Sequence, residues 1–165
     1  MNETVNENIE QIGAGGNWKR IDEKFDASIV KQTSGLSCVS AVGEMLLASR
    51  GISLSQREIL DIIDEPATAE DLARVLNQFD ILIEDKRWHG IATDEGELKK
   101  LLKGGNFAVI LREPLLLGHA VLIDGETNDG LIKIKDPFDQ TVYKMTVEDF
   151  LNHWAGEVIF YGRIK

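Results

Sequence analysis

The sequence predicts an α+β fold, in which an N-terminal layer of helices packs on a C-terminal antiparallel β-sheet. As far as Gly105, apolar residues recur in several segments at the three-and-four spacing of a helix with one buried face. Beyond Gly105, short runs rich in β-branched and aromatic residues alternate with turn residues, which is typical of strands. With 165 residues and 43% hydrophobic content, the chain is long enough to form one domain around a substantial core. Helices followed by strands indicate two layers that share a cleft.

Four helices are expected before Gly105: 38–49, 55–63, a helix that opens at Thr68 and carries Leu72, Val75, Leu76 and Phe79, and 94–102. In the first, Ala41 and Met45 lie on the buried face, and Gly51 follows the helix as a C-terminal glycine. Thr68 and Asp71 are three residues apart and resemble a capping box with a shorter acid, so they mark where the third helix begins.

Five strands are expected after Gly105: 107–111, 119–123, 131–134, 142–145 and 158–164. Asn128-Asp-Gly130 is expected to form a turn between two of them, and Asp124-Gly125 a hairpin turn. Thr146 is expected to cap a short helix that runs through Trp154. The segment 18–31 has an irregular pattern, and we expect a short strand or turn there.

The chain divides into a flexible N-terminal arm, 1–17, and a folded domain, 18–165. The arm is polar and contains Gly13-Ala-Gly-Gly16, a composition typical of linkers. Trp18 is therefore expected to be the first anchored residue.

Charge and composition narrow the range of partners and compartments. A net charge of −10 and a pI near 4.8 argue against binding to nucleic acid or to anionic membranes, which both favour clustered Lys and Arg. One cysteine cannot form an internal disulfide, and a thiol nucleophile favours a reducing compartment. No apolar run approaches the roughly 18 residues that span a bilayer, and the N-terminus lacks the features of a secretory signal. We therefore expect a cytoplasmic protein, with export as a toxin left open.

The single cysteine, Cys38, is the strongest candidate for a catalytic residue. It lies where loop residues give way to an amphipathic run, so it is expected in the first turn of a helix. There, unpaired backbone N–H groups and the positive end of the helix dipole favour thiolate over thiol. Downstream, His119 begins one strand-like run and Asp136 ends another. The chain therefore offers Cys, His and Asp in an order that suits a catalytic triad.

Each member of this triad also has a purely structural interpretation. A lone cysteine in a helix is commonly a small buried hydrophobe, and Asp136 before a proline is a common turn former. Two other histidines compete with His119: His89 in an expected loop and His153 in the last short helix, both interpreted as surface or packing residues. Asp124 is the alternative residue for orienting the histidine. The joint occurrence of the three residue types in this order favours a functional site.

Three short motifs resemble a known family: Gln32 six positions before Cys38, Gly118-His119 at the start of a strand, and the Asp136-Pro137 pair. They are similar to those of the papain-like cysteine peptidases that process bacteriocins and other double-glycine leader peptides. They also resemble the related papain-fold domains of bacterial polymorphic toxins. The resemblance covers roughly 18–160, and it implies a papain-like fold, cleavage of peptide bonds or an allied acyl transfer, and no metal or organic cofactor. The family usually has Asp-Cys-Gly where this chain has Ser37-Cys38-Val39, a departure that bears on substrate preference more than on the nucleophile.

The resemblance and the chemistry give each of four residues an expected role. Cys38 as a thiolate is expected to attack a carbonyl carbon, while His119 holds the thiol proton and later delivers it to the leaving amine. Asp136 is expected to accept a hydrogen bond from the other ring nitrogen of His119 and to fix its tautomer. The side-chain amide of Gln32, with the backbone N–H of Cys38, is expected to donate to the developing oxyanion.

Three functions fit such a site. The first is a cysteine peptidase that works through a thioester acyl-enzyme, and the second is a papain-fold toxin that deamidates glutamine in a protein with the same groups. A non-catalytic binding module on a papain-like scaffold ranks third, because all four site residues are present. One cysteine and three scattered histidines lack the spacing of a metal site. The expected partner is a peptide or protein substrate, with an immunity protein or a fused delivery domain left open.

The arm carries a hypothesis of its own. Ile9 and Ile12 lie at the seventh and fourth positions before a cut placed after Gly15, which resembles a double-glycine leader. The arm is therefore a candidate self-substrate or occluding segment. A flexible glycine linker to a neighbouring domain explains the same residues.

Overall fold

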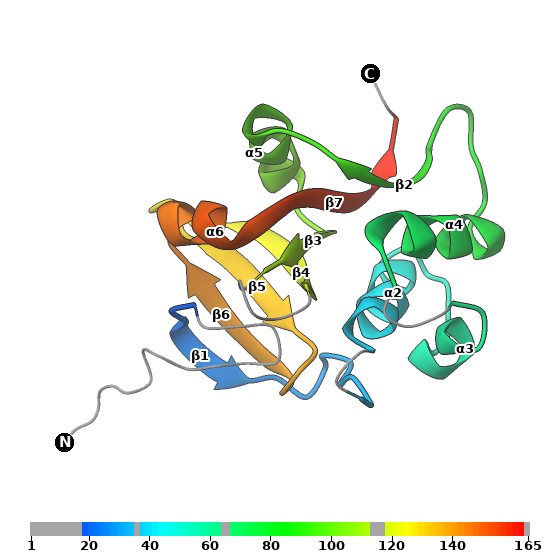
Figure 1. Cartoon of the computed structure of the whole chain (residues 1–165), viewed down its shortest axis with the longest axis horizontal. Coiled ribbons are helices and arrows are strands. Elements are labelled where there is room, and N and C mark those ends of the chain that lie inside the picture. Colours follow the sequence, from blue (N-terminus) through cyan, green and yellow to red (C-terminus); the bar gives the residue numbers. More distant parts are fainter. Residues whose placement is uncertain (1–17, 35–36, 64–66, 113–117, 164–165) are drawn as a thin grey trace.

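A computed structural model of the chain describes residues 18–34, 37–63, 67–112 and 118–163. The predicted arm, 1–17, and its proposed cleavage site lie outside the described residues, so both stay predictions. Helices gather beside an antiparallel sheet, and the chain passes between the two more than once (Figure 1). This architecture confirms the predicted α+β fold.

Three helices form a layer on one face of the sheet: α2 (Cys38–Ala48), α3 (Gln56–Leu60) and α4 (Ala69–Phe79). Two more helices, α5 (Glu95–Gly104) and α6 (Val147–His153), contribute to the core on the other face. All five helices overlap the segments predicted to be helical, because each has the expected apolar face and most have a capping residue.

Side chains cap most of these helices. The Thr68 hydroxyl accepts a hydrogen bond from the backbone N–H of Asp71 at 3.0 Å, and the Asp71 carboxylate accepts one from the N–H of Thr68 at 3.0 Å. The predicted capping box of α4 is therefore confirmed. Asp94 and Thr146 cap α5 and α6 in the simpler one-bond form. Such bonds satisfy the unpaired N–H groups of a helix start, and α2 differs because it lacks one.

Seven antiparallel strands form the sheet in the order β1-β6-β5-β4-β3-β7-β2. Their bounds are β1 (Ile21–Phe25), β2 (Arg87–Ala92), β3 (Phe107–Leu111), β4 (His119–Glu126), β5 (Ile132–Asp136), β6 (Thr141–Met145) and β7 (Trp154–Gly162). Each of the five strands predicted beyond Gly105 overlaps an observed strand. The edge strand β1 falls in 18–31, where a short strand or turn was expected, whereas the other edge strand, β2, comes from the part of the chain that was expected to be mainly helical.

β2 corrects the prediction that His89 lies in a loop. His89 pairs with Phe160 of β7, and the preceding residue, Trp88, is buried. Gly90 weakens the strand pattern in the sequence, yet the structure requires it. A Cβ on Gly90 would lie only 2.0 Å from the carbonyl oxygen of Ala69, so glycine here lets the start of α4 pack directly on the edge strand.

The predicted hairpin turn at Asp124-Gly125 is also wrong. β4 continues through both residues, and its pairing with β5 shifts register between Ile123 and Glu126. Gly125 has a φ of +87°, a conformation that glycine adopts without a steric penalty, and the irregularity is typical of a β-bulge. The turn comes later, as predicted for Asn128-Asp-Gly130: the N–H of Gly130 donates to the carbonyl of Thr127 at 3.0 Å.

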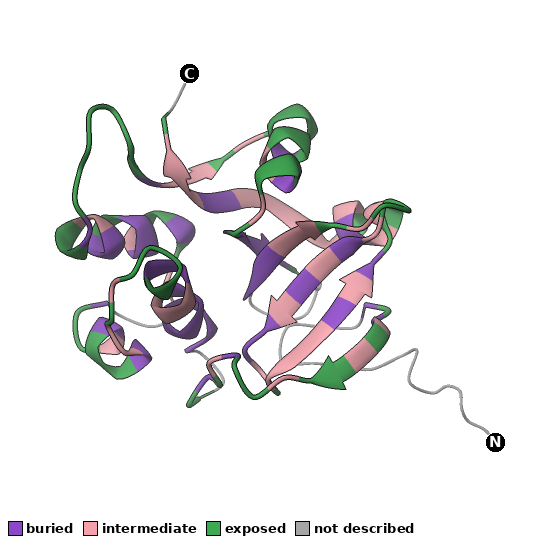
Figure 2. Ribbon diagram, turned by 180° about the vertical axis from the view of Figure 1, so that it is seen from behind, coloured by how far each residue is buried: buried purple, intermediate pink, exposed green. Residues whose placement is uncertain are grey.

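Hydrophobic cores lie on both faces of the sheet, and Figure 2 shows buried and partly buried residues along its strands. In β3, Ala108 and Ile110 belong to the core beneath α2 and α4, while Phe107 and Val109 belong to the core with α5 and α6. Alternate residues of a strand point to opposite faces, so a strand at the centre of this sheet is apolar throughout.

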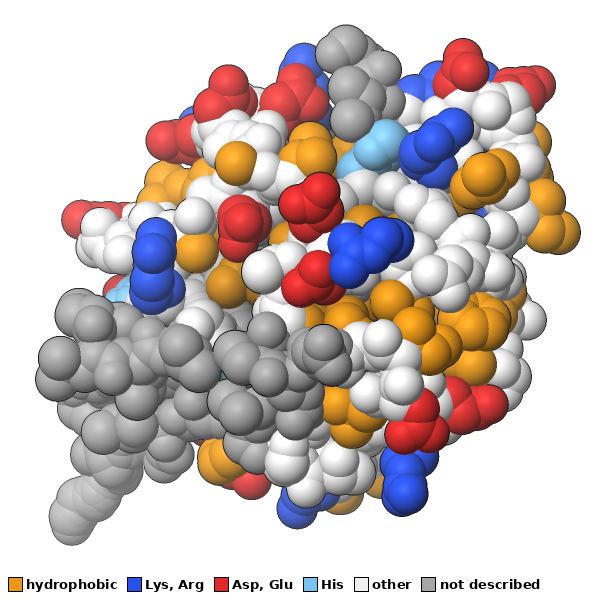
Figure 3. Space-filling view, turned by 45° about the vertical axis from the view of Figure 1, so that its right-hand side comes forward, with side chains coloured by type: hydrophobic (Ala, Val, Ile, Leu, Met, Phe, Trp, Pro, Cys, Tyr) orange, Lys and Arg blue, Asp and Glu red, His pale blue; other side chains and the backbone are white. Residues whose placement is uncertain are grey.

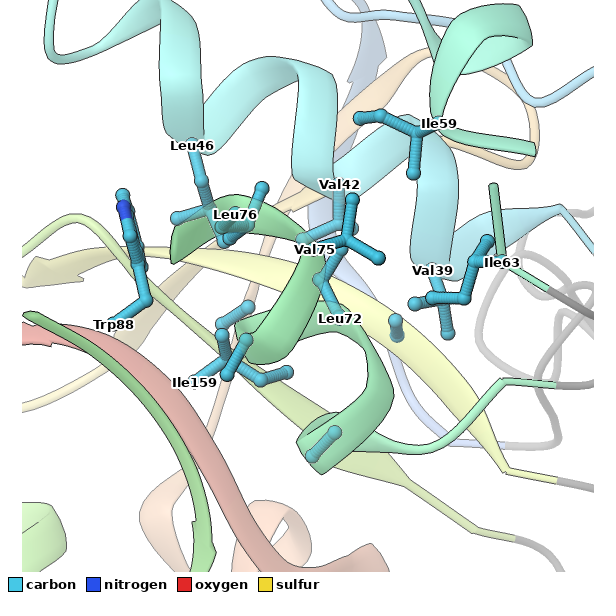
Figure 4. Close-up of a cluster of buried hydrophobic side chains, with 14 of the residues drawn as sticks. Val39, Val42, Leu46, Ile59, Ile63, Leu72, Val75, Leu76, Trp88 and Ile159 are labelled. Atoms are coloured by element: carbon cyan, nitrogen blue, oxygen red, sulfur yellow. The ribbon is translucent and has the colours of Figure 1, made fainter. Parts of the chain in front are cut away.

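The helical core joins α2, α4 and the sheet. Figure 4 shows Val42 of α2, Val75 of α4 and Ile159 of β7 gathered in one cluster. Gly43 allows this close approach, because a Cβ there would lie 2.8 Å from a methyl group of Leu72. The cluster fixes α2 against the sheet and therefore fixes the position of Cys38, its first residue.

The surface mixes charged and apolar side chains. On the face shown in Figure 3, hydrophobic side chains lie among both acidic and basic ones, and Lys and Arg form no continuous patch there. Large exposed hydrophobic residues are Phe25, Ile62, Phe79, Ile81, Leu82 and Ile83. Among the helices in the described ranges, none has the length and apolar character to cross a membrane.

Candidate active site

The backbone of α2 places Cys38 at a helix start that no side chain caps. The N-cap residue, Ser37, makes no side-chain cap hydrogen bond, and the first turn contains no acidic residue. The Ser37 hydroxyl instead donates to the carbonyl of Ser34 at 3.1 Å and accepts from its N–H at 2.9 Å. The partial positive charge of the helix N-terminus is thus left to act on the thiol, which is only 5% exposed.

The start of β4 lies directly against this thiol. The backbone N–H of Ala120 points to Cys38 Sγ, with 3.4 Å between nitrogen and sulfur. His119, the first residue of β4, is 2% exposed and lies near enough to the thiol to lower its pKa. The ring of His119 contacts Asp136 through Nε2, which leaves Nδ1 for the sulfur. The predicted pairing of Cys38 with His119 therefore has the geometry of a nucleophile and its base.

Asp136, the last residue of β5, contacts the ring of His119. Its Oδ1 lies 2.7 Å from His119 Nε2 and also accepts the backbone N–H of Phe138 at 3.0 Å. Its Oδ2 accepts the hydroxyl of Tyr143 at 2.7 Å. The carboxylate is fully buried, and such a group is stable only when donors satisfy its oxygens. Asp136 therefore faces donors on both of its oxygens.

For both Cys38 and His119, burial shifts the pKa in one direction and the neighbouring groups shift it in the other. Burial alone would raise the pKa of the Cys38 thiol, but hydrogen bonding and the charge of His119, with the N–H groups of Ala120 and Val39, outweigh burial and lower it. Burial would lower the pKa of His119, but the charge and hydrogen bond of Asp136, with Cys38, raise it to about 9. Both shifts favour a thiolate–imidazolium pair at neutral pH.

The carboxylate of Asp136 follows the same logic. Burial would raise its pKa, but the charge and hydrogen bond of His119, then the Phe138 N–H and the Tyr143 hydroxyl, lower it. These interactions favour the ionised form of Asp136 beside a protonated His119.

Gln32 lies in the loop before α2, with 5% of its surface exposed. Its backbone N–H donates to the carbonyl of Pro137 at 2.9 Å, so it ties the cysteine loop to the end of β5. Its side-chain Nε2 donates to the carbonyl of Ser34 at 2.8 Å. A carboxamide carries two N–H bonds, and a second one remains after this contact. The buried Oε1 has no hydrogen-bond partner in the described part of the chain.

The competing residues lie elsewhere. Asp124 is partly exposed and forms a 4.0 Å ion pair with Lys135. His89 contacts the carbonyl of Gly162 at the far edge of the sheet, and His153 contacts the carbonyl of Arg112. The structure therefore brings Cys38, His119, Asp136 and Gln32 into one region and leaves Asp124 and His89 outside it. His153 lies at the edge of this region, with its ring 5.4 Å from the ring of Trp18.

Two residues beside the site were missed from the sequence, Trp18 and Tyr143. Tyr143 lies on the buried face of β6, and a hydroxyl on an otherwise apolar strand face was the signal that could have drawn attention to it. Trp18 was expected only to anchor the domain, but its indole stacks on His119 with 6.4 Å between ring centroids.

Two concavities bear on substrate access. One of about 660 Å³ opens over β1, β4, β5 and β6, and its lining contains none of the four candidate residues. A smaller one of about 260 Å³ is lined by Val39, which follows Cys38, and by Gly118, which precedes His119. Of these two concavities, the smaller one therefore adjoins Cys38 and His119. Within the described residues, no cluster of three or more His, Cys, Asp or Glu has an arrangement that could hold a metal ion.

Comparisons of the sequence relate this chain to known peptidases. Residues 26–163 match the model of the Peptidase C39 family. Cysteine protease effector 1 of Escherichia coli O1:K1:H7 is 34% identical over 149 residues, which are 90% of this chain and 29% of that protein. The chain therefore spans less than a third of that relative's length.

Solved structures share the fold. The peptidase domain of Streptococcus ComA, a bi-functional ABC transporter involved in a quorum sensing pathway, aligns with a TM-score of 0.62 at 21% identity, over 82% of this chain and 97% of that domain. The Streptococcus mutans ComA peptidase domain in complex with a small-molecule inhibitor gives a TM-score of 0.58 at 21% identity, over 81% of this chain and 98% of that one. The family match spans most of the chain, including the four candidate residues, and we conclude that this chain belongs to the Peptidase C39 family, a family of cysteine peptidases.

Proposed function

We propose that this protein hydrolyses peptide bonds with Cys38 as nucleophile, His119 as acid and base, and Asp136 as the residue that orients the imidazole. One observation carries the proposal: His119 lies between a buried carboxylate 2.7 Å from its Nε2 and a thiol at an uncapped helix start. A cysteine that served only as a packing residue would need neither neighbour.

The proposed reaction begins from the ion pair. The Cys38 thiolate attacks the carbonyl carbon, a C–S bond forms, and the carbonyl electron pair moves onto oxygen. As the oxyanion collapses, the C–N bond breaks and His119 Nδ1 gives its proton to the leaving amine. Water then attacks the thioester and gives a proton to Nδ1. Collapse of the second oxyanion releases the acid and restores the thiolate beside a protonated histidine.

Gln32 and the helix start are proposed to stabilise the oxyanion. The second N–H of the Gln32 amide and the backbone N–H of Cys38 are the donors that this site offers to a developing negative charge. Removing one such donor typically costs about 3–4 kcal/mol in the barrier, so we propose that Gln32 contributes to rate nearly as visibly as the triad does.

The concavity beside Val39 and Gly118 is proposed to receive the substrate. Small residues from α4 and β7, such as Ala69 and Ala155, line it, and Arg112 and Glu157 add charge. A shallow, mainly apolar space of about 260 Å³ suits one side chain of an extended peptide. The proposed substrate is therefore a peptide or an exposed segment of a protein.

The name of the E. coli relative guides a proposal about the wider role. That protein is described as a cysteine protease effector, and we propose that this chain likewise acts on a protein of a target cell. A delivery domain and an immunity protein are then the expected partners. A reactive thiolate survives best under reducing conditions, so we propose that it works in a cytoplasm.

The test compares the protein with its Cys38→Ala variant. Each is incubated with a bacterial cell extract, new peptide N-termini are labelled and identified by mass spectrometry, and the intact mass of the enzyme is recorded. The proposal expects new N-termini with a common sequence that the variant does not generate. Glutamine residues that gain one mass unit without chain cleavage would support the deamidase instead. The absence of both changes would leave the binding-module function.

The intact mass of the enzyme tests the arm separately. Loss of the first residues of the active enzyme would support self-cleavage of the arm, and an uncut arm would exclude it.

A further inference from the structure

Tyr143 connects the carboxylate of Asp136 to Trp18. The Tyr143 hydroxyl donates to Asp136 Oδ2 at 2.7 Å, and Trp18 Nε1 lies 3.1 Å from the same hydroxyl oxygen. Tyr143 is 2% exposed and Trp18 is 1% exposed. These contacts link the segment before β1, a residue of β6 and the last residue of β5, which are far apart in the sequence.

The chemistry of the indole determines which group donates in each hydrogen bond of the Tyr143 hydroxyl. An indole N–H can only donate, so the tyrosine oxygen must accept from Trp18. The single proton of the hydroxyl is then free to point to the carboxylate. Trp18 thereby orients Tyr143 as a donor to Asp136, and not as an acceptor from another group.

Trp18 also contacts the other partner of Asp136. Its ring stacks on the ring of His119, with centroids 6.4 Å apart and planes 25° apart, and meets the ring of His153 at 5.4 Å. Tyr143 and Trp18 therefore contact both members of the Asp136–His119 pair: Tyr143 contacts the carboxylate and Trp18 contacts the imidazole. Such supporting contacts are known to fix the orientation of a catalytic histidine.

We propose that Tyr143, oriented by Trp18, is a positioning residue that keeps Asp136 an ionised acceptor aligned with His119 Nε2. The proposal rests on the proposed function and adds to it the residues that set the pH range in which Cys38 is a thiolate. If the Tyr143 hydroxyl were removed, the buried Oδ2 of Asp136 would lose this hydrogen-bond donor. A buried carboxylate with an unsatisfied oxygen protonates more readily, and a neutral Asp136 supports the imidazolium less well.

A nearby cation offers a rival explanation. The charged or titratable groups that face Asp136 are His119 from β4, Tyr143 from β6 and Arg20 from the segment before β1. The Arg20 guanidinium carbon lies 4.9 Å from the centroid of the Tyr143 ring. Its Nη1 pairs with Glu23 at 2.9 Å, whereas Nε and Nη2 have no hydrogen-bond partner among the described residues. Its positive charge alone could keep Asp136 ionised.

Tyr143→Phe separates the two explanations. The variant keeps the ring beneath Arg20 and the packing of β6, and removes only the hydroxyl. Tyr161 provides the matched control, because it is the chain's other tyrosine and its hydroxyl donates at 3.1 Å to the carbonyl of Ile81, far from the site. The measurement is the rate of Cys38 alkylation by iodoacetamide across pH, with mass detection, for the two variants and the original protein.

The proposal expects the acid limb of the alkylation profile to move to higher pH by about one unit in Tyr143→Phe, in proportion to a lost hydrogen bond to a charged group. Tyr161→Phe should leave the limb in place. A Tyr143→Phe profile that superimposes on the original would overturn the proposal and assign the effect to Arg20. If the original protein itself shows only a free-thiol profile, the proposed function fails instead, so the two failures are distinguishable.

Trp18→Phe provides a second, independent test of the proposal. It keeps an aromatic ring on His119 but removes the indole N–H, so it should move the limb in the same direction by less. In the double variant the shift should equal that of Tyr143→Phe alone, because Trp18 acts through the hydroxyl. Additive shifts would contradict the connection. If Tyr143→Phe melts far below the original protein, the Trp18→Phe profile decides the question, and an unmoved limb there would overturn the proposal.

Discussion

The proposed nucleophile and the proposed base of this site have different surroundings. Besides His119, the groups that lower the pKa of the Cys38 thiol belong to the backbone: an uncapped helix start and the N–H groups of Ala120 and Val39. His119 owes its environment to side chains, since Asp136 and Trp18 both contact its ring. The difference teaches that, once His119 and the helix start are in place, the side chains flanking the thiol matter little, whereas a buried histidine needs specific side-chain partners to stay charged.

This contrast explains why the flanking residues of Cys38 can differ from the family pattern. Ser37 and Val39 replace the residues usual at those positions, but neither side chain is needed for the helix dipole or for backbone donors. The residues around His119 and Asp136 are less free to vary, because each partner of Asp136 makes a specific hydrogen bond. Substitutions on the two sides are therefore expected to have unequal effects.

The largest effect is expected from Asp136→Asn. An amide in this position favours the wrong tautomer of His119, and a loss of about 10⁴-fold in kcat is expected from comparable triads. Asp124→Asn is the matched control, because Asp124 pairs with Lys135 and does not contact the histidine. Steady-state cleavage of a peptide identified in the proteolysis experiment measures both. Equal losses in the two variants would contradict the assignment of the orienting residue.

Gln32→Ala is expected to lower kcat by about 10²–10³-fold with little change in KM, because the amide acts on the transition state. Gln56 is a useful comparison. It is also buried, and its side chain holds the same loop through Lys31 and Thr33. Gln56→Ala should lower the melting temperature and reduce kcat far less. If the two variants lose the same amount of kcat, Gln32 serves only the loop.

Stability should depend on pH through the His119–Asp136 pair. The pKa of His119 rises from 6.5 to about 9 on folding, so its contribution is complete below pH 6.5 and is lost as pH rises through 9. The pKa of Asp136 falls from 3.8, so its contribution is present above that value and is lost in more acidic solution. The pair should contribute on the order of 3 kcal/mol in the window between.

Urea unfolding of the original protein and of Asp136→Asn checks this. The difference in unfolding free energy should be greatest between about pH 4 and pH 6.5 and should narrow toward pH 9. A difference that stays constant across this range would show that the pair is not charged in the folded state.

A moderate effect is expected from filling the concavity beside the site. Ala155→Phe places a ring in the space lined by Val39 and Gly118. Cleavage of a peptide should fall by about tenfold in kcat/KM, while alkylation of Cys38 by a small reagent should be unchanged. A parallel loss of alkylation would mean that the substitution disturbs the thiol and not substrate access.

The smallest effect is expected from Ser37→Ala. Among the described residues its hydroxyl hydrogen-bonds to Ser34 of the same loop, so stability should fall by roughly 1 kcal/mol. The pH profile of Cys38 alkylation should be unaffected, because the side chain contributes no cap to α2. A shifted profile would show that the nucleophile depends on side chains as much as the base does.

Local patterns in the sequence predicted much of this molecule. α2 begins at Cys38 as expected, and the capping box at Thr68 marks α4 correctly, because helix periods and caps are encoded within a few residues. β2 escaped prediction because Gly90 serves a contact with Ala69, a tertiary reason that no local pattern contains. The bulge at Gly125 was mistaken for a turn because both use glycine with positive φ.

The four candidate site residues were predictable because each belongs to a short motif. Their supporting residues were not. Trp18 and Tyr143 meet Asp136 and His119 only after β1, β4, β5 and β6 have paired, so neither carries a sequence signal of its own beyond a polar atom in an apolar context.

The activated state of the thiol is the central claim, and the alkylation rate of Cys38 by iodoacetamide across pH tests it most directly. The measurement compares the original protein with His119→Ala, with mass detection of the single cysteine. The account predicts fast labelling of the original protein well below the free-thiol pKa of about 8.5, and loss of that labelling in the variant. Two profiles that coincide and follow an ordinary thiol would contradict it.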